Sequence, residues 1–144
     1  MLKKVIQDAI NAQIAKEMYS SNLYLAISAY FHSVSLNGFA HWMRLQADEE
    51  MLHAMKFYDF IINRGGRVEL AALAAPPVEW NDPVHAFTNT VEHEETITNS
   101  INELAGLAQA EKDFATSSFL QWFIDEQVEE EANTNEILDR KSVV

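Results

Sequence analysis

Apolar residues recur along this chain at helical spacing. In the first long segment Ile10, Glu17, Tyr24 and Phe31 follow one another every seven residues, so they share one face of a helix. The same kind of periodicity continues through three further segments. The pattern predicts an all-α protein with four long helices, at about residues 3–32, 38–64, 83–109 and 113–141.

Most of the predicted breaks coincide with the few glycines and prolines, of which the chain has four and three. Asn37-Gly38 indicates a turn, and Gly65-Gly66 is typical of a helix C-terminus. Asp82 and Pro83 suit the N-cap and the first turn of the third helix. Neither glycine nor proline separates the third helix from the fourth, so that boundary rests on periodicity alone.

The connection between the second and third helices is long, at seventeen residues from Gly65 to Asn81. At roughly 3.3 Å per residue it can reach about 55 Å. A helix of the predicted length measures only about 40 Å. The connection can therefore run back along a whole helix and leave the second and third helices parallel. We expect a single domain, residues 1–144, built as a four-helix bundle of two antiparallel hairpins joined by one long crossover.

Glu50 and His53 interrupt the apolar face of the second helix, three residues apart and therefore side by side. An isolated pair of this kind is usually part of a salt-bridged surface turn. The other helices change this interpretation, because each has a polar interruption near its own middle. The complete set is Glu17, Glu50, His53, Glu94, Gln127 and Glu130.

The midpoints of equal helices in a bundle share one level, so these six side chains should converge in the core. Buried carboxylates repel one another and take up protons unless a cation compensates them. Several oxygen donors with one imidazole suit iron or manganese better than zinc. The pattern therefore predicts a buried metal centre, with Glu50 placed to bridge two metal ions.

Bulk composition narrows the class of protein. The net charge of −12 disfavours nucleic acid as a partner and favours cations. No apolar run approaches the ~20 residues of a membrane span, and the N-terminus lacks the pattern of a signal peptide. The chain has no cysteine, which excludes disulfides and thiolate metal sites. We expect a cytoplasmic protein with no membrane partner.

Four motifs together resemble the bacterial non-haem ferritins, and the resemblance extends from about Leu2 to Arg140. The motifs lie at residues 17–24, 47–53, 93–95 and 119–131. The resemblance implies a homo-oligomer, built from dimers into a shell of 24 subunits. It implies that Fe(II) is oxidised by O2 or peroxide at a di-iron ferroxidase centre within the subunit, and that ferric oxide is stored in the shell.

The resemblance also assigns roles to residues. The first iron would be held by Glu17, Glu50 and His53. The second would be held by Glu50 and Glu94, with Glu130 nearby. Tyr24 and Gln127 would orient ligands or bound oxygen. A third, weaker iron site would use Glu49, Glu126, Glu129 and Glu130.

The chain departs from related patterns in two places. It has one Glu-x-x-His motif, and Gln127-Val128-Glu129-Glu130 replaces the second, which argues against a bacterioferritin. We therefore expect no haem, with Met51 packing at a dimer face, and a second iron that is held weakly and passed on. The short fifth helix usual in the family is expected to be absent.

Three other functions are compatible with an acidic helical bundle. A peroxide-reducing di-iron protein of the rubrerythrin kind is disfavoured because no cysteine is present for its usual electron donor. A DNA-protecting mini-ferritin is disfavoured because its metal site lies between subunits, whereas the site expected here lies within the bundle. A non-catalytic bundle that buffers metal or serves assembly stays as the alternative.

Overall fold

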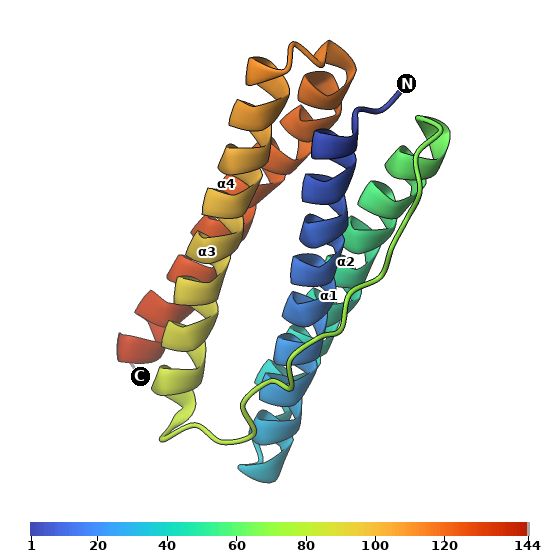
Figure 1. Cartoon of the computed structure of the whole chain (residues 1–144). Helices are drawn as coiled ribbons and strands as arrows, with labels where there is room; N and C mark the ends of the chain where they lie inside the picture. Colours follow the sequence, from blue (N-terminus) through green and yellow to red (C-terminus); the bar gives the residue numbers. More distant parts are fainter. Residues whose placement is uncertain (144) are drawn as a thin grey trace. The chain divides into compact units, whose positions relative to one another are not determined.

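The computed structural model describes the backbone of residues 1–143 and the side chains of residues 1–140. Four helices account for most of this part of the chain, and no strand occurs in it (Figure 1): α1 (Lys4–Ser33), α2 (Asn37–Asn63), α3 (Pro83–Ala110) and α4 (Phe114–Val143). Among these helices none has both the length and the apolar character that a membrane span requires.

The chain forms two compact units, Met1–Pro83 and Val84–Val144. The first unit holds α1, α2 and the crossover, and the second holds α3 and α4. The single domain expected from the sequence stays a prediction. The expected absence of a fifth helix concerns the end of the chain at Val144, which lies outside the described residues.

Helices α1 and α2 pack as an antiparallel pair in the first unit. Two buried serines of α1 donate hydrogen bonds to backbone carbonyls of α2, Ser28 to Ala40 at 2.6 Å and Ser21 to Ala47 at 2.8 Å. Ser21, the earlier serine of α1, contacts Ala47, the later of the two residues of α2, and Ser28 contacts the earlier one, Ala40. The two helices therefore run antiparallel. Both helices also carry buried apolar side chains, including Ile14, Ile27, Phe31, Met43 and Phe57.

The turn between α1 and α2 differs from the predicted one. Asn37 and Gly38 do not form it, because both already belong to the first turn of α2. Ser35 makes the reversal in the left-handed conformation, with φ of 63°. The N–H of Leu36 donates to the carbonyl of Phe31 at 2.8 Å, which satisfies an acceptor at the end of α1. The Asn37-Gly38 prediction was wrong because a serine took the positive φ that glycine usually supplies.

Gly65 ends α2 as predicted. It has φ of +74°, and its N–H donates to the carbonyl of Ile62 at 3.0 Å. The N–H of Gly66 donates to the carbonyl of Ile61 at 2.9 Å. These paired bonds with a left-handed glycine are the arrangement that commonly terminates a helix.

Substituting alanine for Gly65 should therefore lower the free energy of unfolding by about 1–2 kcal/mol, because a Cβ disfavours the left-handed conformation. Gly106 is the matched control, since it lies inside α3 and an added Cβ would meet no atom within 4 Å. Gly106→Ala should raise the same free energy by about 0.5–1 kcal/mol. Unfolding curves of the two variants test this contrast, and equal effects would contradict it.

The crossover returns along α1, as the sequence predicted. Near its start the N–H of Arg67 donates to Oε1 of Gln7 at 3.0 Å, and Nδ2 of Asn11 donates to the carbonyl of Arg67 at 3.0 Å. Near its end the ring of Trp80 lies 5.5 Å from that of Tyr30. Gln7 and Tyr30 lie near opposite ends of α1, so the crossover spans nearly the whole helix (Figure 1). The crossover thus ends beside the end of the pair at which α2 begins.

The break between α3 and α4 is made without glycine or proline. Lys112 takes a positive φ of 55°, and the N–H of Asp113 donates to the carbonyl of Ala108 at 2.9 Å. The Asp113 side chain then caps α4, since its Oδ1 accepts the N–H of Thr116 at 3.1 Å. Asp113 was the available sequence signal for this boundary.

Candidate metal centre

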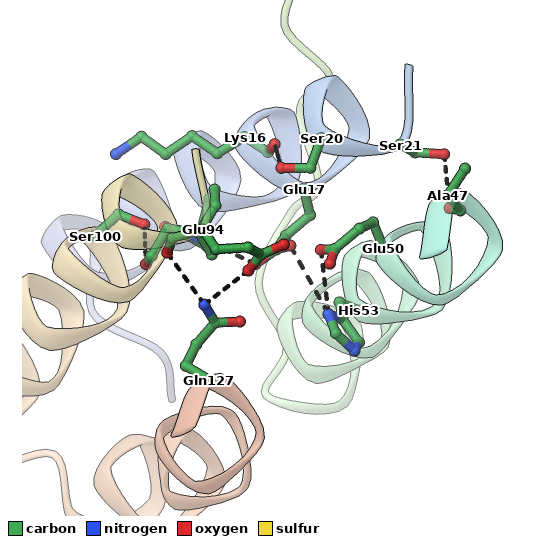
Figure 2. Close-up of polar contacts among 12 residues, drawn as sticks. Lys16, Glu17, Ser20, Ser21, Ala47, Glu50, His53, Glu94, Ser100 and Gln127 are labelled. Carbon is green, nitrogen blue, oxygen red and sulfur yellow. Dashed lines mark hydrogen bonds and ion pairs between the residues drawn. The ribbon is translucent and has the colours of Figure 1, made fainter. Parts of the chain in front are cut away.

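In the first unit the structure brings together Glu17 of α1 with Glu50 and His53 of α2. Each residue offers a ligand atom within 4.8 Å of the others. Nδ1 of His53 lies 3.3 Å from Oε2 of Glu50 and 3.9 Å from Oε2 of Glu17. Figure 2 shows the two carboxyl groups and the imidazole ring turned toward one another. The antiparallel pairing of α1 with α2 places these mid-helix positions at one level.

These three side chains are almost completely removed from solvent, with exposed fractions of 1%, 0% and 4%. Burial raises the pKa of Glu17 well above its usual range, and the nearby Glu50 carboxyl raises that pKa further. His53 and a hydrogen bond from Gln13 act in the opposite direction; Nε2 of Gln13 donates to Oε1 of Glu17 at 3.2 Å. A divalent cation between the ligand atoms would favour the ionised form of both carboxyl groups.

The second unit holds its own buried polar group. Glu94 of α3 and Gln127 and Glu130 of α4 are 1%, 4% and 4% exposed. Nε2 of Gln127 donates to Oε2 of Glu94 at 3.1 Å (Figure 2). Burial lowers the pKa of the adjacent His93 to about 4, so its imidazole is neutral at pH 7 and adds no positive charge. A cation would again be the natural complement of this acidic group.

The remaining predicted site residues have different environments. Tyr24, two turns beyond Glu17 on α1, is buried. Glu49 and Glu129 are exposed, and Glu126 is half-buried. Three of the four residues expected at a third iron site are therefore more exposed than the buried acids, and the fourth, Glu130, is itself buried.

Two polar residues that contact predicted site residues were not identified from the sequence. Gln13 precedes Glu17 by one helical turn, and Thr98 follows Glu94 by one helical turn. Thr98 accepts a hydrogen bond from Gln127 at 3.0 Å. Their spacing of four residues from a predicted ligand was the usable signal.

Comparisons with known proteins identify the fold and the family. The family model of the ferritin-like domain matches residues 7–142. The chain belongs to the ferritin family. A bacterial non-heme ferritin of Bacteroides fragilis is 45% identical over 140 residues, which cover 97% of this chain and 88% of that protein. One of Staphylococcus aureus is 39% identical over 92% of this chain and 80% of its own length.

Solved ferritin structures agree with the sequence relatives. The open-pore ferritin of the archaeon Archaeoglobus fulgidus matches with a TM-score of 0.97 and 48% identity, covering 99% of this chain and 87% of that one. An engineered closed form of the same archaeal ferritin matches with a TM-score of 0.98. The predicted resemblance to bacterial non-haem ferritins and the predicted four-helix fold with a long crossover are therefore confirmed.

Proposed function

We propose that this ferritin oxidises Fe(II) at a di-iron centre within each subunit, using Glu17, Glu50, His53, Glu94 and Glu130 as ligands. Iron storage and ferroxidase activity are the activities of its family. The observation that supports this centre most directly is the buried cluster of Glu17, Glu50 and His53, which offers two carboxylates and one imidazole within 4.8 Å.

The first Fe(II) binds between Glu17, Glu50 and His53. Oxygen and imidazole donors both suit iron, and two ionised carboxylates balance its double positive charge. Because burial disfavours the ionised form of Glu17, iron binding displaces a proton from the apo site. The two carboxylates are therefore both ionised, with their charge balanced, only when the metal is bound.

The second Fe(II) binds to Glu94 and Glu130, with Glu50 as the bridging ligand. Both residues are carboxylates buried near the middle of their helices. This position has no imidazole of its own, because Glu130 stands where the histidine of a second Glu-x-x-His motif would lie, and Gln127 stands where the glutamate of that motif would lie. We expect the second iron to bind more weakly than the first, which suits a centre that releases its product.

Oxidation at the paired site moves one electron from each Fe(II). One O2 molecule that takes up two electrons and two protons leaves as H2O2. When peroxide is the oxidant, one H2O2 takes up two electrons and two protons and leaves as two water molecules. The protein contributes fixed ligands and a site closed to solvent. Tyr24, buried two turns from Glu17, is proposed to orient ligands or bound oxygen.

The ferric product then moves toward more exposed acidic residues. Glu126 is half-buried and Glu129 exposed on α4, and Glu49 is exposed on α2. We place a third, weaker iron site among these residues and Glu130.

Ferric iron collects as hydrated oxide inside a homo-oligomeric shell, which we propose has 24 subunits assembled from dimers and resides in the cytoplasm. Light scattering of the purified protein tests the subunit number, and a dimeric mass would contradict the shell.

Crystals soaked anaerobically in Fe(II) test the di-iron centre directly. Anomalous scattering should reveal two peaks about 3–4 Å apart, the separation typical of two-metal sites. One peak should lie against the imidazole of His53 and the other against the carboxylate of Glu94. A protein that binds no iron at these residues would contradict the proposed function.

A further inference from the structure

A series of side-chain hydrogen bonds extends from Glu94 to a carboxylate with no role in the proposed centre. Nε2 of Gln127 donates to Oε2 of Glu94 at 3.1 Å and to Oγ1 of Thr98 at 3.0 Å. The hydroxyl of Thr98 in turn donates to Oε2 of Glu131 at 3.2 Å. All four residues belong to α3 and α4, so the second unit contains the whole series.

The Glu131 carboxylate, at the end of this series, determines which group donates and which accepts in each hydrogen bond. An ionised carboxylate only accepts hydrogen bonds, whereas a hydroxyl donates one and accepts others. Because Thr98 gives its single proton to Glu131, its oxygen can only accept from Gln127. The amide of Gln127 must therefore present its NH2 group, and not its carbonyl oxygen, toward Thr98 and Glu94.

The NH2 group has two hydrogens, and the geometry accounts for both. One is directed to Thr98 and the other to Oε2 of Glu94. A longer approach of the same nitrogen to the backbone carbonyl of Glu94, at 3.4 Å, shares the second hydrogen. Both hydrogens of the Gln127 amide nitrogen are thus engaged in hydrogen bonds, and one carboxylate oxygen of Glu94 is held in place.

We propose that Thr98 and Glu131 are positioning residues for the second iron site. They fix the orientation of the Gln127 amide, and Gln127 in turn holds the Glu94 carboxylate for metal binding. This inference rests on the proposed function, in which Glu94 is a ligand of the second iron.

The spacing of the four residues suits this role. Glu94 and Thr98 lie four residues apart on α3, and Gln127 and Glu131 lie four residues apart on α4, so each pair occupies one face of its helix. Thr98 and Glu131 are both half-buried, which limits the competition of water for their hydrogen bonds. If Thr98 loses its hydroxyl, this series of hydrogen bonds no longer fixes the amide. The amide would then keep only its hydrogen bonds to Glu94, at 3.1 and 3.4 Å, and would move with that side chain, so the Glu94 carboxylate would be held less firmly.

Anaerobic titration of the assembled protein with Fe(II), followed by calorimetry, tests the proposal. Thr98→Val keeps the shape of the side chain but removes the hydroxyl. It should weaken the second binding event by about 10–100-fold, as loss of an outer hydrogen-bond partner does at other metal sites, and leave the first unchanged. Thr98→Ser should restore wild-type affinity because it keeps the hydroxyl.

Thr90→Val is the matched control. Thr90 lies on the same helix and is buried, and its hydroxyl donates to the backbone carbonyl of Ala86 at 3.0 Å. The control therefore loses a buried hydroxyl without touching the hydrogen bonds from Glu131 to Glu94, and both binding events should persist. Equal second-event affinities in Thr98→Val and Thr90→Val would overturn the proposal, as would a failure of Thr98→Ser to restore binding.

Two further variants make the outcome decisive. In a Gln127→Leu background, Thr98→Val should cause no additional loss of affinity for the second Fe(II), because Thr98 acts only through Gln127. An additive loss would contradict the proposal.

Glu131→Gln, a nearly isosteric change at a half-buried site, should weaken the second binding event, since an amide can donate to Thr98 and reverse the direction of the hydrogen bonds. An unchanged second event in Glu131→Gln would remove Glu131 from the proposal.

Glu94→Gln separates this inference from the proposed function. Loss of the second binding event in Glu94→Gln supports the ligand assignment, whether or not Thr98→Val has an effect. An unchanged second event in Glu94→Gln overturns that assignment, and with it the role of Thr98.

Discussion

Glu50→Gln is expected to slow dioxygen-dependent Fe(II) oxidation by about 100-fold or more. Loss of an outer partner of a metal ligand already costs roughly 10–100-fold, and Glu50 is proposed to contact both metal ions. The glutamine keeps the size of the side chain but removes the negative charge that binds the cations. Stopped-flow absorbance of the ferric product measures the rate. His53→Ala should cause a comparable loss through the first iron alone.

Asp48→Asn is the control for charge, because Asp48 lies on the same helix, two residues from Glu50, and is exposed. It should oxidise iron at the wild-type rate. Wild-type oxidation by Glu50→Gln would show that the bridging ligand has been assigned wrongly.

The metal-free Glu50→Gln protein should also be more stable than the wild type. Glu50 is fully buried, and its carboxyl raises the pKa of Glu17, so the two acids destabilise each other when both are ionised. Removing one negative charge relieves that repulsion. A residue retained only for the fold would show the opposite result, a lower thermal midpoint. Lost activity together with raised stability is therefore the signature of a ligand.

The second large effect concerns the pH dependence of the metal-free protein. The pKa of Glu17 is well above its usual value of 4.5 in the folded state, because of burial and of Glu50. Between pH 4.5 and the raised pKa, the folded state holds a proton that the unfolded state has released. Lowering the pH through this window should stabilise the fold, by at most about 1.4 kcal/mol per pH unit for this one proton. The gain is complete below the unfolded pKa and lost above the folded one.

Glu17→Gln should remove this contribution, leaving a flatter stability profile and a more stable metal-free protein at neutral pH. Glu103→Gln, at an exposed position of α3, is the control and should keep the wild-type profile. Thermal midpoints measured between pH 5 and 8 test the difference. Identical profiles for wild type and Glu17→Gln would mean that Glu17 is not the group that takes up the proton. Added Fe(II) should stabilise the wild type more than Glu17→Gln, because the metal replaces that proton.

Much of the architecture was predictable because it depends on local patterns. The helical spacing of apolar positions indicated the four helices, and Gly65 ends α2 because a left-handed residue is needed there. The length of the segment after Gly65 predicted the long crossover, since an extended chain covers more distance per residue than a helix. The buried acids were predictable for a similar reason. Each occupies the position in its helix where an apolar residue would otherwise be expected.

The turn predicted at Asn37-Gly38 failed because it depends on a backbone conformation which several residues can adopt. Ser35 takes the positive φ at that turn, and Lys112 takes a positive φ at the turn between α3 and α4, whose place was predicted from periodicity. Residue preference could not select either position, because the hydrogen bonds that stabilise these conformations come from the ends of the adjoining helices.

By itself, the sequence determined that this is a ferritin with long helices and an asymmetric set of buried acids and one histidine, because residue type and spacing specify both. The tertiary structure decided which atoms meet. The antiparallel register of α1 and α2 brings Nδ1 of His53 to 3.3 Å from Glu50 and 3.9 Å from Glu17. The packing of α3 with α4 joins Gln127 to Thr98. Such contacts depend on helix register and side-chain rotamers, which arise only when the helices pack.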